Sequence, residues 1–313
     1  MDKKDFLNHF SQWKDICDSP CLNEYKPSHA QQKIEVFHFI NPLCPECWGI
    51  EPHIKKLQIE YGHILKLRPF LTGNISELNA STNPQKKRSL ANHWERTSSR
   101  TGMVCTGALW LKDPIKRPFI LSLSMKAAEL QGQKLGNRFS RILREKIFIE
   151  TKNVERKHLL LECAKEAGLD IDEFFTDLHS ESAAKALQCD FTIAKDFDVQ
   201  VLPTLIFFHH NIEEPGIKVS GYQDFNVYER IIEDLLGGSV QKTPLPPICY
   251  FVKKFKLFAL KEVCTVYDIS PETARNHLLP MVIRGVLKEH HTPLGYYYKY
   301  IYPINENKSE RFK

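Results

Sequence analysis

The stretch "FINPLCPECWGIEP", residues 39–52, decides the fold, because two cysteines stand three positions apart just before a helical pattern. Cys44 and Cys47 enclose Pro45 and Glu46. This spacing is typical of a redox dithiol and of half a metal site. It can also be a remnant of redox chemistry in a protein that now performs another task.

The residues around the pair predict a strand, a turn, a helix and a second strand. Residues 34–40, "IEVFHFI", are rich in β-branched and aromatic residues, which favours a buried strand. From Cys47 onward, apolar residues recur at the spacing of one helix face, and Gly62 is the expected end of that helix. Residues 64–73 predict another strand. The order strand, CxxC turn, helix, strand is that of the first βαβ unit of a thioredoxin-type fold.

Beyond the second strand, the chain is mostly helical in pattern up to about residue 195. Leu135, Phe139, Ile142 and Leu143 form one apolar stripe, and a second stripe is made of Leu160, Leu161, Ala164 and Ala167. We therefore expect a helical insertion over about 80–195.

After the insertion, "VQVLPTLIFFHHN" (199–211) and "GIKVSGYQD" predict two strands, and a helix is expected over about 224–236. Pro203 directly precedes an apolar run, so we expect it at the start of the strand or in a cis bond.

A Gly-, Ser- and Pro-rich stretch, "GGSVQKTPLPPI" (237–248), predicts an interdomain linker. The expected fold is α/β: a thioredoxin-like domain with a helical insertion, followed by a small winged-helix domain. The boundaries that we expect are an N-terminal arm at 1–30, the thioredoxin-like domain at 31–240, the linker at 241–248, the winged-helix domain at 249–303 and a tail at 304–313.

The winged-helix prediction depends on "DIS-PETARNHLLPMVIRGVL" and the hairpin pattern after it. Ser270 is the expected N-cap, Pro271 takes the first helical position, and Pro280 is expected to end or kink the helix early. The wing would turn at 293–295.

DNA binding through this helix would use Arg275, Asn276 and His277. The wing, however, presents tyrosines with scattered lysines, whereas phosphate binding needs clustered cations. We therefore expect a protein-docking or structural role for this domain and no DNA partner.

Charge and composition limit the class of protein. From residue 248 to the end there are eleven Lys and Arg against six Asp and Glu, whereas the preceding 247 residues contain 32 of each. This excess indicates a separate unit with its own partner. No secretory signal and no apolar run of membrane-spanning length is recognisable, so we expect a cytoplasmic protein without a membrane partner.

The position of the dithiol predicts its chemistry. Cys44, at a helix N-terminus, would be the attacking thiolate, and Cys47, one turn inside the helix, would resolve the mixed disulfide. Pro203 and Thr204 would form the loop that faces the pair. Glu46 places a carboxylate beside the thiolate, which opposes ionisation and predicts a poor oxidant.

A zinc site would need a second pair of ligands. Cys17 and Cys21, with His9 and His29 nearby, are candidates, but their spacing matches no closed zinc site. The alternative for this segment is a loosely packed arm. We expect no metal and no cofactor.

The segments "NPLCPECWGIEP", "AGLDIDEFFTDL" and "VQVLPTLIFF" resemble the DsbA family of thioredoxin-fold proteins. The nearer resemblance is to the YjbH/SpxH branch of Gram-positive bacteria, in "LCPECWGIEPHIKKL" and in the two-domain arrangement. That resemblance implies a cytoplasmic adaptor that delivers the transcription regulator Spx to the ClpXP protease through ClpX, with no enzymatic activity of its own required.

Two positions depart from the DsbA pattern. DsbA-type oxidants have His between the cysteines where this chain has Glu46, and the usual glycine two residues before the cis-Pro is Val201 here. Both departures, together with the lack of a recognisable export signal, favour an adaptor whose groove binds a protein. Trp48 and Leu202 are candidate contacts, and core packing is the alternative role for them. A cytoplasmic thiol-disulfide oxidoreductase is the alternative function, and a redox- or metal-responsive DNA-binding regulator is a third.

Overall fold

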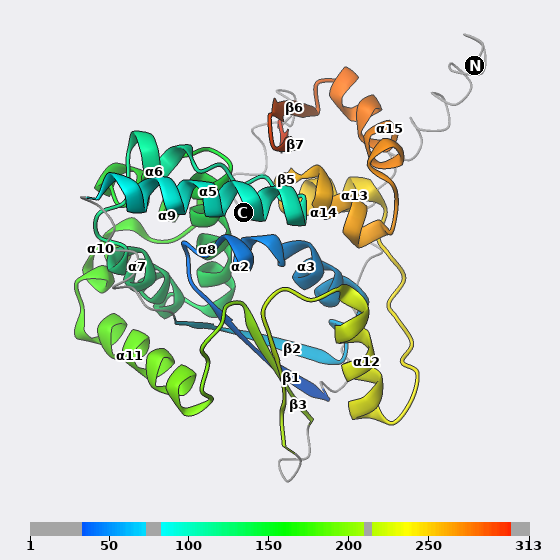
Figure 1. Ribbon diagram of the computed structural model, residues 1–313, viewed down its shortest axis with the longest axis horizontal. Coiled ribbons are helices and arrows are strands. Elements are labelled where there is room, and N and C mark those ends of the chain that lie inside the picture. The colour runs from blue at the N-terminus through cyan, green and yellow to red at the C-terminus, as the bar shows by residue number, and fades with distance from the viewer. Residues whose placement is uncertain (1–32, 73–82, 210–214, 302–313) are drawn as a thin grey trace, which may run out of the picture.

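The computed structural model describes residues 33–72, 83–209 and 215–301, so the expected N-terminal arm and C-terminal tail lie outside the described residues. Its centre is a four-stranded sheet in the order β2-β1-β3-β4 (Figure 1). The strands are β1 (Ile34–Ile40), β2 (Leu65–Leu71), β3 (Thr204–His209) and β4 (Ile217–Ser220). β1 pairs in parallel with β2, and the β1–β3 and β3–β4 pairs are antiparallel. The predicted opening strand–helix–strand unit is confirmed.

The two faces of this sheet are covered by different helices. Alternate residues of β1, such as Ile34 and Val36, share a core cluster with residues of α3 (Glu51–Glu60) and α12 (Phe225–Leu236). Phe37 and Phe39 point to the opposite face and pack against the end of α11 and the loop after it. The sheet is therefore buried on both sides, which explains the continuous apolar run of β1.

The helix that was expected to run without a break from Cys47 to Gly62 is two helices, α2 (Pro45–Gly49) and α3. Pro52, in the first turn of α3, has no N–H to continue the ladder of α2, so the chain restarts there. Gly49 faces Thr101 so closely that a β-carbon would lie 2.7 Å from the Thr101 methyl group. The short α2 is thus pressed against α5.

The predicted helical insertion is confirmed and consists of seven helices within the described residues. Phe139 and Leu143 of one predicted stripe, and Leu160, Ala164 and Ala167 of the other, are buried. The helices are α5 (Pro84–Thr101), α6 (Ala108–Lys112), α7 (Phe119–Leu130), α8 (Gln133–Phe148), α9 (Lys157–Ala167), α10 (Ile171–Leu178) and α11 (Glu181–Asp196).

The C-terminal part contains three helices and a small antiparallel sheet in the order β5-β7-β6. The elements are α13 (Ile248–Phe255), β5 (Leu257–Ala259), α14 (Leu260–Tyr267), α15 (Pro271–Ile283), β6 (Leu287–Thr292) and β7 (Gly295–Tyr300). Ser270 caps α15, since its Oγ accepts from the Thr273 N–H at 3.1 Å. Pro280 lies inside α15, which runs on to Ile283 instead of ending early. None of the described helices has the length and apolarity to cross a bilayer.

The predicted linker is held against the sheet domain by hydrogen bonds. The Thr243 N–H donates to the Glu60 carbonyl at 2.8 Å, and Thr243 Oγ1 lies 3.0 Å from His63 Nδ1. Further along, the Tyr267 hydroxyl donates to the Pro246 carbonyl at 2.9 Å. The linker is therefore anchored at both ends.

A buried cluster of charges joins the C-terminal part to the rest of the molecule. Figure 1 shows α13 and α14 above α3. Glu262 of α14 has no exposed surface and pairs with Lys55 of α3 and with Arg141 of α8, the latter at 3.0 Å. The same carboxylate accepts from the Ala259 N–H at 2.8 Å. Arg141 also reaches Glu145 at 2.6 Å. Three elements distant in sequence therefore share one ionic network.

Replacing Glu262 by Ala leaves Lys55 and Arg141 without their shared carboxylate inside the protein. Losing one partner of a buried ion pair costs about 3–5 kcal/mol, so we expect the free energy of unfolding to fall by about that amount in urea denaturation. Glu181→Ala is the matched control, because Glu181 pairs with Lys185 on the exposed surface of α11, where ion pairs contribute little. Equal losses in the two variants would contradict the role given to the buried network.

Candidate functional site

The dithiol lies at the N-terminus of α2, as predicted. Cys44 is the N-cap residue, and its Sγ accepts a hydrogen bond from the Cys47 N–H at 3.0 Å. Cys44 is partly exposed, so its sulfur is accessible from solvent. The exposed member of the pair is thus the one that the sequence assigns to nucleophilic attack.

Cys47 is fully buried, unlike Cys44. Burial, followed by its hydrogen bond to the Cys44 thiol, raises the pKa of Cys47 well above its usual range. A resolving thiol is expected to stay protonated until the mixed disulfide forms, and the raised pKa of Cys47 agrees with this. Because Cys47 is buried, its sulfur can reach Cys44 but no substrate in solution.

Glu46 is not the uncompensated anion that the sequence indicated. Its carboxylate accepts from Thr97 Oγ1 at 2.7 Å and pairs with Arg100, both on α5. Because the Arg100 guanidinium neutralises this charge, repulsion between Glu46 and a Cys44 thiolate is weaker than the sequence alone implies. No local pattern around residues 97–100 marks these partners, so sequence reasoning missed them.

The loop that faces the dithiol begins with a cis peptide bond between Leu202 and Pro203, in agreement with the expectation for Pro203. Thr204 holds this loop through its hydroxyl, which donates to the Val201 carbonyl at 2.6 Å and lies 3.1 Å from Ser220 Oγ. The Pro203 carbonyl accepts from the Gly221 N–H at 2.7 Å. Arg100, which pairs with Glu46, lies 4.8 Å from the centre of the Tyr222 ring, and Tyr222 follows the Gly221 that is hydrogen-bonded to Pro203, so the dithiol and the loop lie near each other.

Trp48 is not accessible as the partner contact that the sequence suggested. Its ring has no exposed surface, stacks on Phe148 at 5.3 Å between ring centres, and donates from Nε1 to the Val104 carbonyl at 2.9 Å. Arg141 lies over the other face of the indole at 4.4 Å. Trp48 is therefore a core residue that packs the dithiol helix onto α8.

Leu202 is partly buried, and its neighbour Val201 is 52% exposed. Val201 is the residue that replaces the glycine expected by the DsbA pattern, and it adds an apolar side chain to the rim of the groove. We call the binding groove that the sequence predicts the dithiol groove and assign Cys44, Glu46, Val201 and Leu202 to it. It combines one partly exposed thiol with an exposed apolar side chain.

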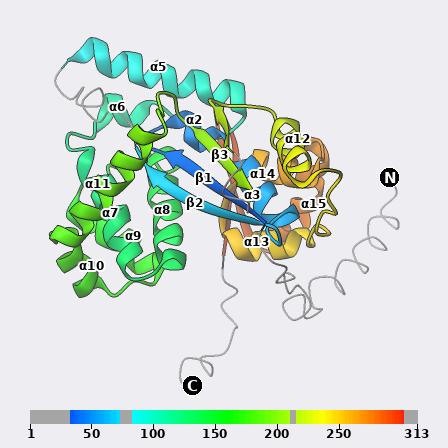
Figure 2. The same ribbon diagram turned by 90° about the horizontal axis from the view of Figure 1, so that it is seen from below.

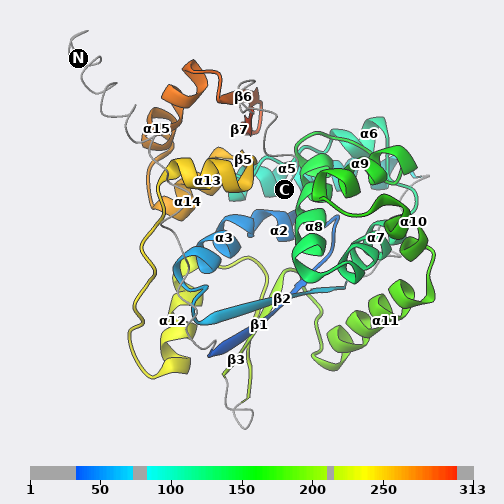
Figure 3. The ribbon, with the colours of Figure 1, turned by 180° about the vertical axis from the view of Figure 1, so that it is seen from behind.

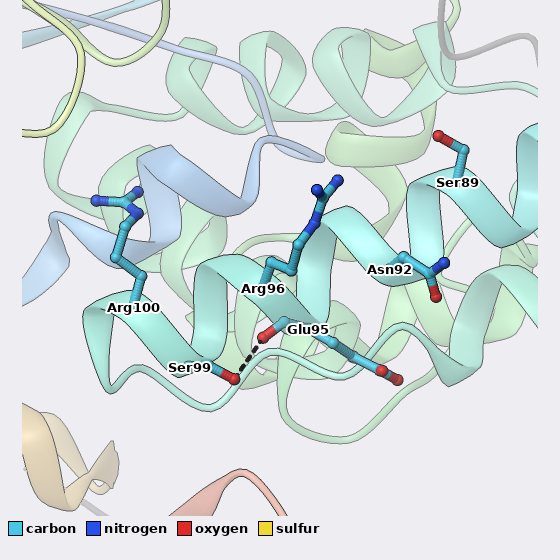
Figure 4. Close-up of a pocket in the computed structure, with 6 residues that line it drawn as sticks. All are labelled: Ser89, Asn92, Glu95, Arg96, Ser99 and Arg100. Atoms are coloured by element: carbon cyan, nitrogen blue, oxygen red, sulfur yellow. Dashed lines mark hydrogen bonds between the residues drawn. The ribbon is translucent and has the colours of Figure 1, made fainter.

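A polar surface on α5 adjoins this groove. Figure 4 shows six side chains, all from α5, that line a shallow pocket: Ser89, Asn92, Glu95, Arg96, Ser99 and Arg100. Ser99 Oγ donates to the Glu95 carbonyl at 3.0 Å, a bond within the helix. Arg100 links this surface to the dithiol through Glu46. Since no second element converges on the pocket, it extends the groove and contains no catalytic constellation.

The C-terminal hairpin leans on the sheet domain instead of projecting freely. Tyr297 packs against the main core, and a β-carbon on Gly295 would lie 3.5 Å from the Val104 side chain. Arg275, which was expected to face DNA, stands 4.4 Å over the Tyr296 ring and 3.7 Å from Glu289 of the hairpin. These contacts hold Arg275 against the hairpin.

The proposed zinc ligands Cys17 and Cys21 lie outside the described residues. Within the described ranges, no three His, Cys, Asp or Glu side chains gather in a way that could hold a metal ion.

Comparison with known proteins identifies a family to which the chain is similar and relatives that match most of its length. The thioredoxin family profile matches residues 37–230. A ClpXP adapter protein SpxH from Halalkalibacterium halodurans is 38% identical over 290 residues, covering 91% of this chain and 95% of the relative. Its counterpart from Bacillus subtilis is 42% identical over 252 residues, covering 80% and 83%.

Solved structures agree with this chain at the level of fold. A putative protein disulfide isomerase from Nitrosomonas europaea superposes with a TM-score of 0.56 at 16% identity, covering 66% of this chain and 98% of that one. The cytosolic disulfide reductase DsbM from Pseudomonas aeruginosa gives 0.50 at 16% identity, covering 65% and 95%. Each covers about two thirds of this chain.

The different exposure of the two thiols predicts unequal reactivity. With iodoacetamide at neutral pH, we expect Cys44 to be labelled at least about ten times faster than Cys47, because only a thiolate that solvent reaches is alkylated. Mass spectrometry with fragment assignment measures both sites, and exposed Cys189 serves as an internal reference. Comparable labelling of Cys47 in the folded protein would show that the pair is more open than the structure indicates.

Proposed function

The chain belongs to the thioredoxin family and, within it, to the ClpXP adapter protein SpxH family, and from this premise we propose that it is an adaptor that brings Spx to the ClpXP protease. The observation that supports this most strongly is identity of 38% over nearly the whole length of both chains. An adaptor raises the effective concentration of a substrate at the protease, and it needs no covalent chemistry. ClpX would be the protease subunit that it meets, in the cytoplasm.

We place one contact of the adaptor with its substrate at the dithiol groove. Val201 offers an exposed apolar side chain beside partly buried Leu202, and exposed apolar contacts are enriched in protein interfaces. Arg96 on α5 extends this surface with a positive charge, next to Arg100, whose charge is paired with Glu46. A partner segment with apolar and acidic side chains fits it.

The C-terminal part, 249–303, has in this proposal the role of a winged-helix-like docking module that is fixed to the thioredoxin-like domain. Its ionic network with α3 and α8 and its anchored linker hold the two parts in one arrangement. A fixed arrangement favours delivery because substrate and protease are then held at a defined separation.

Thiol-disulfide exchange is the second candidate function. The observation that favours it is the partly exposed Cys44, which caps α2 beside the loop of Pro203. In that reaction the Cys44 thiolate attacks a substrate disulfide, one substrate sulfur leaves as a thiol, and Cys47 then displaces the other and closes an intramolecular disulfide. Cys47 is buried from solvent but is hydrogen-bonded to the Cys44 thiol, so it is placed to attack that sulfur in the second step.

The adaptor proposal is tested by the initial rate at which purified ClpXP degrades labelled Spx with ATP, with and without this chain. We expect the chain to accelerate degradation, and Val201→Asp to reduce the acceleration at least about fivefold, since loss of a central apolar contact typically costs more than 1 kcal/mol. Leu111→Asp on α6 is the control, because Leu111 is 56% exposed and lies outside the groove. Degradation that is equally fast without the chain would refute the adaptor role, and equal effects of the two variants would refute the assigned contact.

Cys44→Ser separates the two candidate functions. We expect the variant to accelerate degradation within about twofold of the unaltered chain, because the adaptor role uses the groove as a surface and Ser differs from Cys by one atom. Reduction of a glutathionylated peptide by the unaltered chain, monitored by fluorescence and lost in the variant, would support the exchange reaction. If the variant is folded but no longer promotes degradation, the dithiol is part of the adaptor mechanism and the proposal in its present form is wrong.

A further inference from the structure

A cavity of about 850 Å³ lies where the C-terminal part meets the sheet domain. Its walls come from β1 and β2, from α3, from α8, and from the C-terminal residues 254–257 and 299–300. Figure 3 shows α8 standing beside α2 and α3, with the C-terminal elements above them. None of the residues of the dithiol groove lines the cavity, so the two are separate. Its volume is within the range of small-molecule sites, about 300–1,000 Å³.

The lining of this cavity is strongly cationic. Nine Lys and Arg side chains line it, against four Glu. Arg141 and Arg144 are compensated, since both pair with Glu51, at 3.3 Å and 2.6 Å. Burial raises the pKa of Glu145 to about 7, so that carboxyl is only half ionised at neutral pH.

Four of these cations have no carboxylate ion pair among the described residues. They are Lys134 and Arg138, one turn apart on α8, Lys254 at the end of α13, and Lys299 of β7. All four side chains are exposed, and they come from the two parts of the protein. Uncompensated cations from opposite walls attract a multiply charged anion.

His38 of β1 is one of the residues that line the cavity, but its side chain is only 5% exposed. Burial lowers the pKa of His38 to about 4, so the ring adds no positive charge to the lining at physiological pH.

The remaining lining shapes the site. Leu67 and Pro69 of β2, with Phe255 and Tyr300 of the C-terminal part, give it apolar walls next to the cations. Apolar walls with a few convergent polar groups are characteristic of small-molecule sites. An extended peptide needs an open groove, whereas here four sets of elements bound the space.

We propose that this cavity binds a small phosphate-type polyanion through Lys134 and Arg138 of α8 and through Lys254 and Lys299 of the C-terminal part. Inorganic polyphosphate and the phosphate tail of a nucleotide share this chemistry. Because the cations come from both parts of the protein, the bound anion bridges them and stabilises their arrangement.

Isothermal titration calorimetry of the full chain alone tests the proposal, with sodium tripolyphosphate in one arm and magnesium-free ATP in the other. We expect at least one probe to bind. Lys134→Gln combined with Arg138→Gln should weaken it on the order of tenfold or more, because charge-assisted hydrogen bonds are lost. Lys254→Gln should weaken it several-fold. Lys86→Gln combined with Arg88→Gln is the matched control, since it removes one exposed Lys and one exposed Arg from α5, outside the cavity.

The two arms distinguish the sources of the anion. Binding of tripolyphosphate alone indicates inorganic polyphosphate, and tighter binding of ATP indicates a nucleotide; both results support the site. Absence of binding in both arms would overturn it, as would equal weakening by the control variant. A decaglutamate peptide that binds more tightly than either probe would assign the surface to an acidic protein segment and refute the small-molecule site. No protease is present, so these outcomes are independent of the adaptor assay.

Discussion

The pairing of Glu262 with Lys55 and Arg141 is the interaction on which the arrangement of the whole molecule depends. A carboxylate without solvent contact is tolerable only where cations and N–H groups surround it, and here α3, α8 and the Ala259 N–H supply them. Arg141 then continues to Glu51 and to the face of Trp48. If the sheet domain, the insertion and the C-terminal part separated, buried charged side chains would lose their ion-pair partners.

That network also explains the state of the dithiol. Trp48 lies one residue after Cys47 and is clamped between Arg141 and Phe148, which fixes α2 and keeps Cys47 inside the core. A rigid surface loses little conformational freedom when a partner binds, so this packing of α2 favours recognition. The contact between the Cys47 and Cys44 thiols is also the contact that thiol exchange requires.

Figure 2 shows the C-terminal elements gathered at one end of the molecule, beside α3 and α12, with α5 running past α2. Gly102, at the end of α5, faces Lys261 of α14. The dithiol groove adjoins α5, and the cationic cavity lies between α3, α8 and the C-terminal part. A partner at the groove and an anion in the cavity would therefore act on different faces of the same rigid α2–α3 segment. This separation allows each to be tested without disturbing the other.

The sequence by itself determined the elements and their order. The strand before Cys44, the helical insertion, the cap at Ser270 and the position of Pro203 follow from local periodicity and residue type, which do not depend on distant contacts. Family membership also follows from sequence, because it depends on identity along the chain. Pro52 was the local signal that we missed for the break between α2 and α3.

Only the tertiary structure decided which side chains are available. The sequence predicted Trp48 as a partner contact and Glu46 as an uncompensated anion. In the structure, Trp48 is buried beneath Arg141, and Glu46 is paired with Arg100, which lies 54 residues away in the chain. The cationic cavity joins residues from positions 38, 134, 138 and 254, and no spacing in the chain links them. Burial and charge compensation arise from contacts between distant segments, and for that physical reason the functional surfaces became visible only in the folded chain.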